Sequence, residues 1–402
     1  MIALFLASSL ALAANTHRTP TVEQWAVDPH STGVYLHDAR APLVTIQIQL
    51  PVGLEMETTR EAGLREAWQL QASDPEGQLD DREARLGGQL RLLVYGQITT
   101  LEILCLAEDL PEVRELLIDI LNNRAYSSAE LFAERWELAG EWKRNHEHPL
   151  KVRTEAARKL AFAETDPRHP PASAYRPPVT DSEALATLRD QVLETPGRIV
   201  ALAGDLTLEQ AQAFATELLP PANPERQWTA PTYEALPERP ARHVVPLEGI
   251  SQAHLELFTL GLAAKDPSLP AWTVAHHVLG GHPNSRVTST LRHGHGDTYS
   301  ARGFSRRSHV PSRAGLVVST RAQNADGAER RLVEVLQVFH AEGITEPELA
   351  DAVHAVAHGQ PPGWSHLDLA AVEALTLDEV NAVIGAHFDP ADFTMVVVVP
   401  EK

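Results

Sequence analysis

Glu66 and Gln69 are the first residues in the chain whose types and spacing suggest chemistry. They stand three positions apart in EAGLREAWQL (61–70), which has the pattern of an amphipathic helix that follows a glycine. Residues three apart are neighbours on the surface of a helix, so a carboxylate and an amide would share one site there. The pair fits either the polar part of an active site or an ordinary helix surface.

The histidines are the second set of residues with possible chemistry, because the chain has 19 of them. Two groups stand out, namely His276, His277, His282, His293 and His295, and the pair His146 and His148. Residues i and i+2 do not share a helix face, so His293 and His295 would chelate a metal only from a loop. No spacing in either group matches a zinc motif. We therefore expect these histidines to lie on the surface or to cap helices.

Cys105 is the only cysteine, and it lies in the apolar run LEILCLAEDL. A single cysteine forms neither an internal disulfide nor a thiolate cluster around zinc. Its apolar neighbours predict a buried, unreactive thiol.

The net charge excludes one class of partner. The chain carries 34 Lys and Arg against 54 Asp and Glu, a net charge of −20. A nucleic-acid binder needs a basic face to meet phosphates, so this balance argues against nucleic acid as a ligand. The 402 residues, 43% of them hydrophobic, are sufficient for two globular domains of about 200 residues each.

Several segments have clear strand or helix patterns. LVTIQIQL (43–50) alternates apolar and polar residues, which predicts a strand with one buried face, and VYLHD (34–38) is a candidate hairpin partner for it. Residues 87–109 contain two strands joined by a short turn. GRIVALAGD (197–205) has the continuous apolar pattern of a buried strand between two helices.

The second half of the chain repeats the plan of the first. ISQAHLELFTLGL (250–262) corresponds to the strand at 43–50, and residues 369–400 repeat the helix–turn–strand order of 182–205. Seven prolines between 220 and 246 favour an extended connection. We predict an α+β fold with two tandem homologous domains, each an antiparallel-rich sheet packed with helices. The predicted limits are 25–225 for the N-terminal domain, 226–244 for the proline-rich linker and 245–402 for the C-terminal domain.

The N-terminus has features of an export signal. Residues 1–14 contain an apolar run from Ile2 to Ala14 that ends in a small-x-small pattern near Ala13. This run is shorter than the roughly 20 apolar residues that span a bilayer, and no later segment is long and apolar enough to do so. The sequence predicts a signal peptide at 1–14 and export to the periplasm; a mis-assigned start codon or a plain buried segment is the alternative.

The stretch LGGHPNSRVTSTLRHGHGDTYSARG (279–303) carries a family resemblance. It is similar to the C-terminal-domain pattern of the insulinase/pitrilysin/mitochondrial-processing-peptidase-type family of inverted zincin metallopeptidases. The matching positions are Leu279, Gly280, Gly281, Ser285, Arg286, Leu291, Arg292, Gly296 and Tyr299. The order of elements over most of the chain also agrees with that family.

The resemblance implies a role for Arg292 and Tyr299, which have the seven-residue spacing of the Arg/Tyr pair that contacts the bound peptide in this family. An arginine fork can hold carbonyl oxygens or a carboxylate, and a tyrosine hydroxyl can stabilise a developing oxyanion. The alternative is that Arg292 forms a surface ion pair and that Tyr299 is a half-buried strand residue.

The resemblance also answers the question about Glu66 and Gln69, because they lie where the family has its zinc motif H-x-x-E-H. Glu66 replaces the first histidine, Gln69 replaces the general base and Leu70 replaces the second histidine. Leu70 cannot bind a metal, and Gln69 cannot take a proton from water. Glu141 stands about where the family has its third ligand, so Glu66 and Glu141 together would hold a cation only weakly. The resemblance therefore implies a chain with no zinc site of its own.

The sequence as a whole predicts a non-catalytic subunit of a heterodimeric zinc metallopeptidase. Its partner would be a paralogous zinc-bearing peptidase chain, and its ligand a peptide or unfolded protein. Two alternatives remain open. One is a purely structural or peptide-binding family member, and the other is an active metallopeptidase with an atypical metal site.

Overall fold

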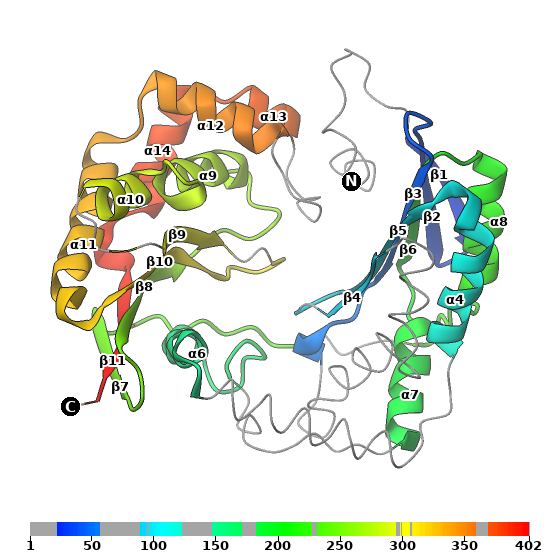
Figure 1. Cartoon of the computed structure of the whole chain (residues 1–402), viewed down its shortest axis with the longest axis horizontal. Helices are drawn as coiled ribbons and strands as arrows, with labels where there is room; N and C mark the ends of the chain where they lie inside the picture. Colours follow the sequence, from blue (N-terminus) through cyan, green and yellow to red (C-terminus); the bar gives the residue numbers. More distant parts are fainter. Residues whose placement is uncertain are drawn as a thin grey trace. The chain divides into compact units, whose positions relative to one another are not determined.

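The structure is a computed structural model of the 402-residue chain. It describes residues 22–56, 89–94, 96–122, 147–170, 182–226, 231–294, 298, 300–305, 308–358 and 369–401. The chain divides into two compact units, one formed by residues 1–143 and 171–231 and the other by residues 144–170 and 232–402. Figure 1 shows that each unit is a sheet with its own helices. Among the described residues, no helix has the length and hydropathy needed to cross a bilayer.

The first unit contains a six-stranded sheet in the order β1-β2-β6-β3-β5-β4. Its strands are β1 (Val22–Asp28), β2 (Ser31–His37), β3 (Leu43–Leu50), β4 (Gln89–Val94), β5 (Thr99–Leu106) and β6 (Arg198–Gly204). Its helices are α4 (Leu110–Asn122), α7 (Ser182–Leu193) and α8 (Leu208–Leu218), with short 3-10 turns at Leu54–Met56 and Ala107–Asp109. The two strands predicted within 87–109 are β4 and β5, which pair as an antiparallel hairpin.

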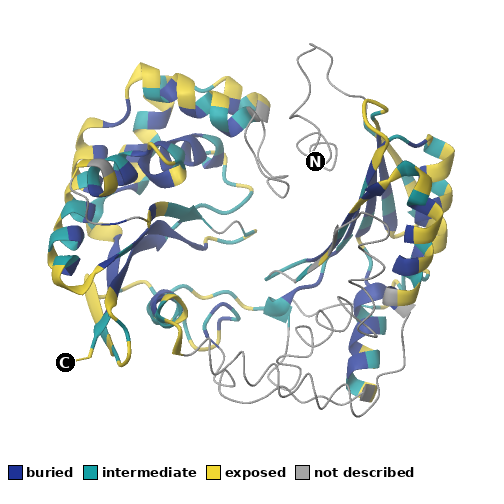
Figure 2. Ribbon diagram, in the orientation of Figure 1, coloured by how far each residue is buried: buried dark blue, intermediate teal, exposed yellow. Residues whose placement is uncertain are grey.

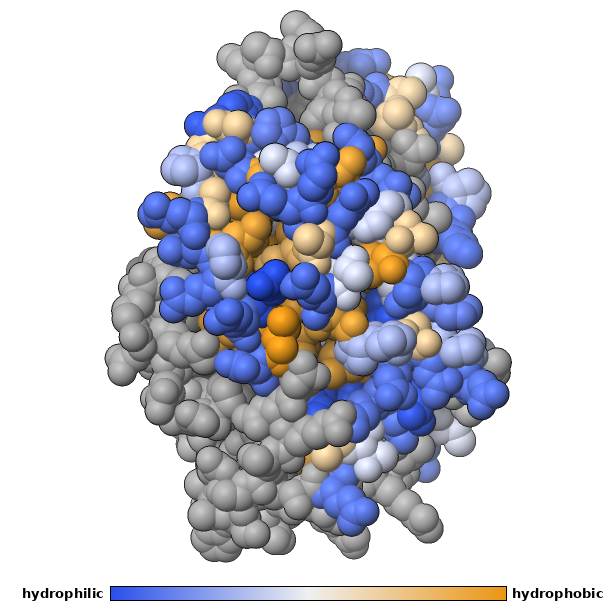
Figure 3. Space-filling view, turned by 90° about the vertical axis from the view of Figure 1, so that its right-hand side faces the viewer, coloured by the Kyte–Doolittle hydropathy of each residue, from blue (hydrophilic) through white to orange (hydrophobic). Residues whose placement is uncertain are grey.

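The alternation along β3 builds the core of the first unit. Val44, Ile46 and Ile48 are fully buried, in one cluster with apolar residues of α4, α7 and α8. Cys105 lies in the same cluster, and burial raises the pKa of its thiol to about 12, which matches the predicted unreactive thiol. The outer side of α4 and α8, which faces the viewer in Figure 3, is mostly hydrophilic with apolar side chains between the polar ones.

The segment 34–38 does not form a hairpin with β3, so that prediction is wrong. It belongs to β2, and β6 lies between β2 and β3, parallel to the first and antiparallel to the second. The continuous apolar sequence of β6 is typical of such a central strand, which is covered on both faces. Gly204 ends β6 with φ 137°, and a Cβ there would lie 2.0 Å from the Leu43 carbonyl oxygen, so glycine is required for this approach.

The second unit contains a five-stranded sheet in the order β7-β11-β8-β10-β9. Its strands are β7 (Arg242–Leu247), β8 (Gln252–Leu260), β9 (Ser300–Ser305), β10 (Arg313–Arg321) and β11 (Thr394–Pro400). Its helices are α6 (Pro149–Ala161), α9 (Leu269–His276), α10 (Arg286–Thr288), α11 (Ala325–Glu342), α12 (Glu346–His358), α13 (Leu369–Glu373) and α14 (Leu377–His387). The π-helical turns η5 (His277–Gly281) and η6 (Ser289–Gly294) follow α9 and α10, and 3-10 turns lie at Ala322–Asn324 and Pro390–Asp392.

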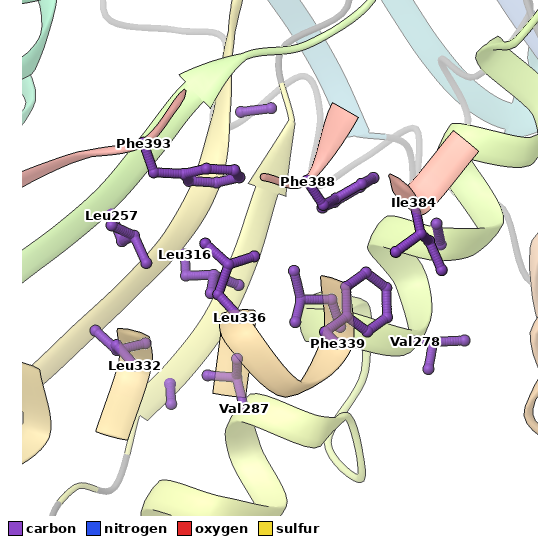
Figure 4. Close-up of a cluster of buried hydrophobic side chains, with 14 of the residues drawn as sticks. Leu257, Val278, Val287, Leu316, Leu332, Leu336, Phe339, Ile384, Phe388 and Phe393 are labelled. Carbon is purple, nitrogen blue, oxygen red and sulfur yellow. The ribbon is translucent and has the colours of Figure 1, made fainter. Parts of the chain in front are cut away.

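The core of the second unit lies between this sheet and the helices α9 to α14. Figure 4 shows Leu257 and Leu316 on the strands meeting Leu332, Leu336 and Phe339 on α11. Figure 2 shows the same division by burial, with dark strands inside and exposed outer helix faces. The amphipathic pattern of α11 is what directs these apolar side chains to the sheet.

The strand orders of the two units confirm the predicted duplication. The order β2-β6-β3-β5-β4 in the first sheet repeats as β7-β11-β8-β10-β9 in the second, with the same single parallel pair at one side. The predicted correspondence of 250–262 with 43–50 is therefore that of β8 with β3. The predicted α+β class, with two antiparallel-rich sheets packed with helices, is confirmed.

Helix α6 belongs to the second unit, although it comes from the first half of the chain. It packs on β7, β8 and β11, on the sheet face opposite the other helices (Figure 1). Its buried Arg153 donates from Nε to Glu256 of β8 at 3.2 Å, and Arg313 of β10 donates to the other carboxylate oxygen. The sequence gives no signal for this position, because an amphipathic helix does not indicate which sheet it covers. The domain limits 25–225, 226–244 and 245–402 stay predictions.

Replacing Glu256 is expected to destabilise the second unit strongly. Glu256→Gln removes the charge between two buried guanidinium groups, and removing one partner of a buried ion pair costs about 3–5 kcal/mol. Urea denaturation followed by circular dichroism measures this loss. Glu342→Gln, at an exposed position on α11, is the matched control and should change the free energy of unfolding by less than about 0.5 kcal/mol. Equal effects of the two variants would show that the buried carboxylate does not hold α6 in place.

Candidate functional site

Arg292 is the predicted substrate-contact residue that the structure describes. It lies in the π-helical turn η6 and is exposed, while its neighbour Leu291 is fully buried. No residue in the described ranges forms an ion pair or hydrogen bond with its guanidinium group. The surface ion pair that the sequence left open as its alternative role is thus not found among these residues. Arg292 is a cation available to a ligand.

The backbone around Arg292 is held from its N-terminal side by α10. Ser285, only 1% exposed, caps this short helix by accepting from the Thr288 backbone N–H at 3.4 Å. Val287 and Leu291 are both fully buried and fix the same turn in the core.

Arg286 ties α10 to the start of α12. Its Nε and Nη2 donate to the two carboxylate oxygens of Glu348, both at 2.8 Å, and Nη2 also donates to the Gly343 carbonyl at 2.8 Å. Arg286 also lies over the Phe339 ring, 5.3 Å from its centroid. The hydrogen bonds from Arg286 lower the pKa of Glu348 to about 2, despite partial burial. Arg286, which carries part of the family resemblance, is therefore a positioning residue.

The glycines of the LGG stretch allow η5 to lie directly against β9. A Cβ on Gly280 would be 2.7 Å from the backbone nitrogen of Gly303, closer than such atoms approach. Thr288 adds a second link, because its hydroxyl donates to the Ala301 carbonyl at 2.8 Å. Together these contacts fix the distance between the turn that carries Arg292 and the strand that follows Tyr299.

The start of β9 is held by Thr298. Its hydroxyl oxygen lies within hydrogen-bond distance of the carbonyl oxygens of Ser300 and Ser319, one of which accepts its proton, and it accepts from the Ser300 backbone N–H at 2.9 Å. Tyr299 and Gly296 lie outside the described residues. The pairing of Arg292 with Tyr299 stays a prediction, although Arg292 and the segments around it are well fixed.

The degenerate motif positions Glu66, Gln69, Leu70 and Glu141 also lie outside the described residues. The side chains at these four positions do not suit a catalytic zinc site. Leu70 has no atom that can bind a metal, and Gln69 cannot act as a general base. In the ranges that the structure does describe, no three His, Cys, Asp or Glu side chains are grouped to hold a metal ion.

The prediction that the clustered histidines are surface or capping residues is wrong for His276. It is buried, its ring stacks on Trp272 at a centroid distance of 5.0 Å, and its Nε2 lies 3.4 Å from the Gly315 carbonyl oxygen. His277 stacks on His282 at 4.8 Å, and His282 accepts from the Asn284 backbone N–H. His148 is exposed beside α6, His293 lies in η6, and His146 and His295 lie outside the described residues.

Two charged residues of the second unit, Glu348 and Arg302, were not singled out from the sequence. Glu348 had a signal, because Thr345 and Glu348 form a T-x-x-E capping pattern at the start of α12, and the Thr345 backbone N–H donates to Glu348 at 2.9 Å. Arg302 had no sequence signal, because a single arginine in a strand is indistinguishable from an ordinary exposed residue.

Comparisons with known proteins agree with this architecture. Residues 191–356 match the family model described as the peptidase M16 inactive domain. The solved peptidase M16 inactive domain from Pseudomonas fluorescens is 18% identical with a TM-score of 0.80, covering 95% of this chain and 98% of that one. A protease from Helicobacter pylori is 15% identical with a TM-score of 0.82, covering 95% and 100%. A conserved protein from Enterococcus faecalis V583 is 14% identical with a TM-score of 0.69, covering 94% and 99%. At these identities the structural likeness establishes the fold. No curated protein matches the chain.

Breaking the Arg286–Glu348 pair is expected to loosen the turn that carries Arg292. Glu348→Gln removes a partly exposed, doubly hydrogen-bonded carboxylate, so a loss of about 1–2 kcal/mol in the free energy of unfolding is expected. The folded-state pKa of about 2 lies below the ordinary value of 4.5, so this stability is present above pH 4.5 and is lost as the pH falls toward 2. Denaturation at pH 7 compares the variant with Glu346→Gln, an exposed neighbour on α12. Equal stability of both variants would contradict the clamp.

Acidification from pH 7.5 to 5.5 is expected to destabilise the protein through its buried histidines. Burial lowers the pKa of His254, His276 and His277 to about 4 each, against about 6.5 in an unfolded chain. The unfolded chain therefore binds more protons in this range, so stability is complete above pH 6.5 and is lost as the pH falls toward 4. The loss at pH 5.5 should be on the order of 1 kcal/mol for the buried His254 and His276, and less for the partly exposed His277, where solvent screens the charge. Urea denaturation at both pH values measures it, and His277→Gln should reduce the difference; an unchanged pH dependence would refute the contribution of His277.

Proposed function

Because residues 191–356 match the family model of the peptidase M16 inactive domain, we propose that the chain is the non-catalytic subunit of a heterodimeric zinc metallopeptidase. The family resemblance inferred from residues 279–303 is thereby confirmed, and a peptidase-like, non-catalytic member is what the match supports directly. The finer proposal adds a paralogous zinc-bearing chain as partner. That chain would supply the metal and the general base, while this one would supply contacts to a peptide or unfolded protein.

The observation that carries the proposal is the state of Arg292. An exposed guanidinium group with no partner in the described ranges stands on a turn fixed by Ser285, Arg286 and Leu291. A rigid fork of N–H donors on a fixed backbone is suited to peptide carbonyl oxygens or a carboxylate. Donors held in place before the reaction stabilise developing charge best, and Tyr299 would add a hydroxyl if it lies beside Arg292.

The lack of zinc ligands and of a general base at the family's motif positions supports a partner chain that provides them. Zinc, when bound, would activate a water molecule for attack on a peptide carbonyl. The residues at the family's motif positions do not fit zinc, so no step of that kind is assigned to this chain. A substrate-contact residue kept without a metal site is useful when another chain brings the metal to the same peptide.

Export is part of the same proposal. The apolar run and small-x-small pattern of residues 1–14 support a signal peptide and a periplasmic location. Polypeptides in extended or unfolded form would then be the substrates. A gene next to that of this chain, encoding a similar protein with an intact H-x-x-E-H, would identify the partner to co-express.

The isolated chain is expected to have no peptidase activity and to bind no stoichiometric zinc, and to support activity only with its zinc-bearing partner. In the complex, Arg292→Ala should lower kcat/KM for an unfolded protein substrate by about 10- to 100-fold, because a preorganised donor is lost. Arg330→Ala, at an exposed arginine on α11, is the control and should leave turnover unchanged. Cleavage of a quenched fluorescent peptide and metal analysis of the purified proteins give both readouts.

The alternatives give different results in the same experiment. Stoichiometric zinc with chelator-sensitive cleavage by the isolated chain would overturn the proposal and establish an atypical metal site. Unchanged turnover of the complex with Arg292→Ala would favour a purely structural subunit.

A further inference from the structure

A group of basic side chains lies on the face of the second sheet opposite its helical core. Arg302 of β9 is opposite Val317 of β10, which is opposite Glu256 of β8, so the three residues form one row across the sheet. Partners in such a row point to the same face. That face is the one on which α6 packs, since Arg153 of α6 reaches Glu256. Arg302 therefore lies on the α6 side, at the strand that ends the sheet as described.

The surroundings of this row hold more positive than negative charge. The carboxylate of Glu256 is shared by Arg153 and Arg313 and is only 1% exposed. Arg302 is exposed and has no hydrogen-bond or ion-pair partner among the described residues. Burial is the main cause that lowers the pKa of Arg153, and the charge of Arg302 lowers it further. The two guanidinium groups therefore repel each other electrostatically. Three guanidinium groups thus lie near one buried carboxylate in this part of the structure.

The next row along the sheet adds polar donors to the same face. Ser300, Ser319 and His254 are successive partners, and His254 Nδ1 lies 2.9 Å from the Ser319 hydroxyl. Burial, with Arg153 and His148 nearby, lowers the pKa of His254 to about 4, so it is a neutral hydrogen-bonding group at pH 7.

We infer that Arg302 is the centre of a carboxylate-binding subsite, formed with the exposed Ser300, that selects an acidic side chain or the free C-terminus of an extended peptide. The inference rests on the proposed peptide-binding function and specifies which peptides are preferred. A guanidinium fork binds a carboxylate through two parallel, charge-assisted hydrogen bonds. The outer edge of β9 would offer backbone groups to an extended chain, as strand edges do.

A purely structural role does not explain Arg302. Its exposed side chain makes no described contact that folding would need, and its like charge acts against Arg153. A bound carboxylate would relieve that repulsion by placing a negative charge between the two cations. Arg302→Gln is therefore expected to keep or raise the melting temperature while weakening the binding of acidic peptides. Residues that favour binding at the expense of stability are typical of functional sites.

The test measures binding of labelled twelve-residue peptides to the full chain by fluorescence anisotropy. One peptide is neutral with an amidated C-terminus, a second differs only by one central Asp, and a third is the neutral peptide with a free C-terminal carboxylate. We expect the wild type to bind at least one carboxylate-bearing peptide about 10-fold more tightly than the neutral one, with a preference that decreases in high salt. The second and third peptides identify which source of carboxylate is bound.

Two variants and a control decide the inference. Arg302→Gln should reduce the preference to less than 2-fold and leave binding of the neutral peptide unchanged, and Arg302→Glu should favour a peptide with Lys in place of Asp. Arg330→Gln, on the helix that covers the opposite face, should keep the wild-type preference. Equal wild-type binding of all three peptides, or a preference retained in both Arg302 variants, would overturn the subsite and leave the proposed function standing. Absence of binding to every peptide would overturn the peptide-binding function and the subsite together.

Discussion

The second unit depends on a buried carboxylate, Glu256, that is held between Arg153 and Arg313. Removing these charges from water is unfavourable, and the pairing compensates only while both guanidinium groups stay in place. Arg153 comes from α6, so a helix from the first half of the chain covers one face of the sheet in the second unit. The chain leaves the first unit after residue 143 and returns to it at residue 171. A fragment cut at the proline-rich linker would therefore lack a helix that its sheet requires.

Close packing also determines the role of most residues in the segment with the family resemblance, 279–303. Most of its described residues serve the packing of η5, α10 and β9, as Gly280 does against Gly303 and Arg286 does with Glu348. Its arginines Arg292 and Arg302 are exposed and have no hydrogen-bond or ion-pair partner in the described ranges. Most of the residues that match the family pattern therefore stabilise the fold, and only the few exposed side chains can take part in chemistry.

The sequence predicts those parts of the fold that local pattern determines. Alternation identified β3, and the repeated order of helix and strand identified β8 and the duplication, because both can be read from local sequence pattern. Pairing between distant segments was not determined in this way, so β2 was placed beside β3 although β6 lies between them. The position of α6 was missed for the same reason. At the site, the family pattern located Arg292, whereas Glu348 and Arg302 required spatial neighbours that no sequence spacing shows.

The two exposed arginines, Arg292 and Arg302, differ in what holds them, and this difference bears on how the chain would act on a peptide. Arg292 stands on a turn fixed by core residues, so its geometry is set before any ligand arrives, which is the condition for stabilising developing charge. Arg302 stands on an edge strand beside another cation, so its contribution is an unsatisfied charge that attracts a carboxylate. Neither property requires a metal on this chain. In the proposed heterodimer, a subunit without the residues for zinc would therefore still position and select a peptide, and these are the functions that its catalytic partner would need from it.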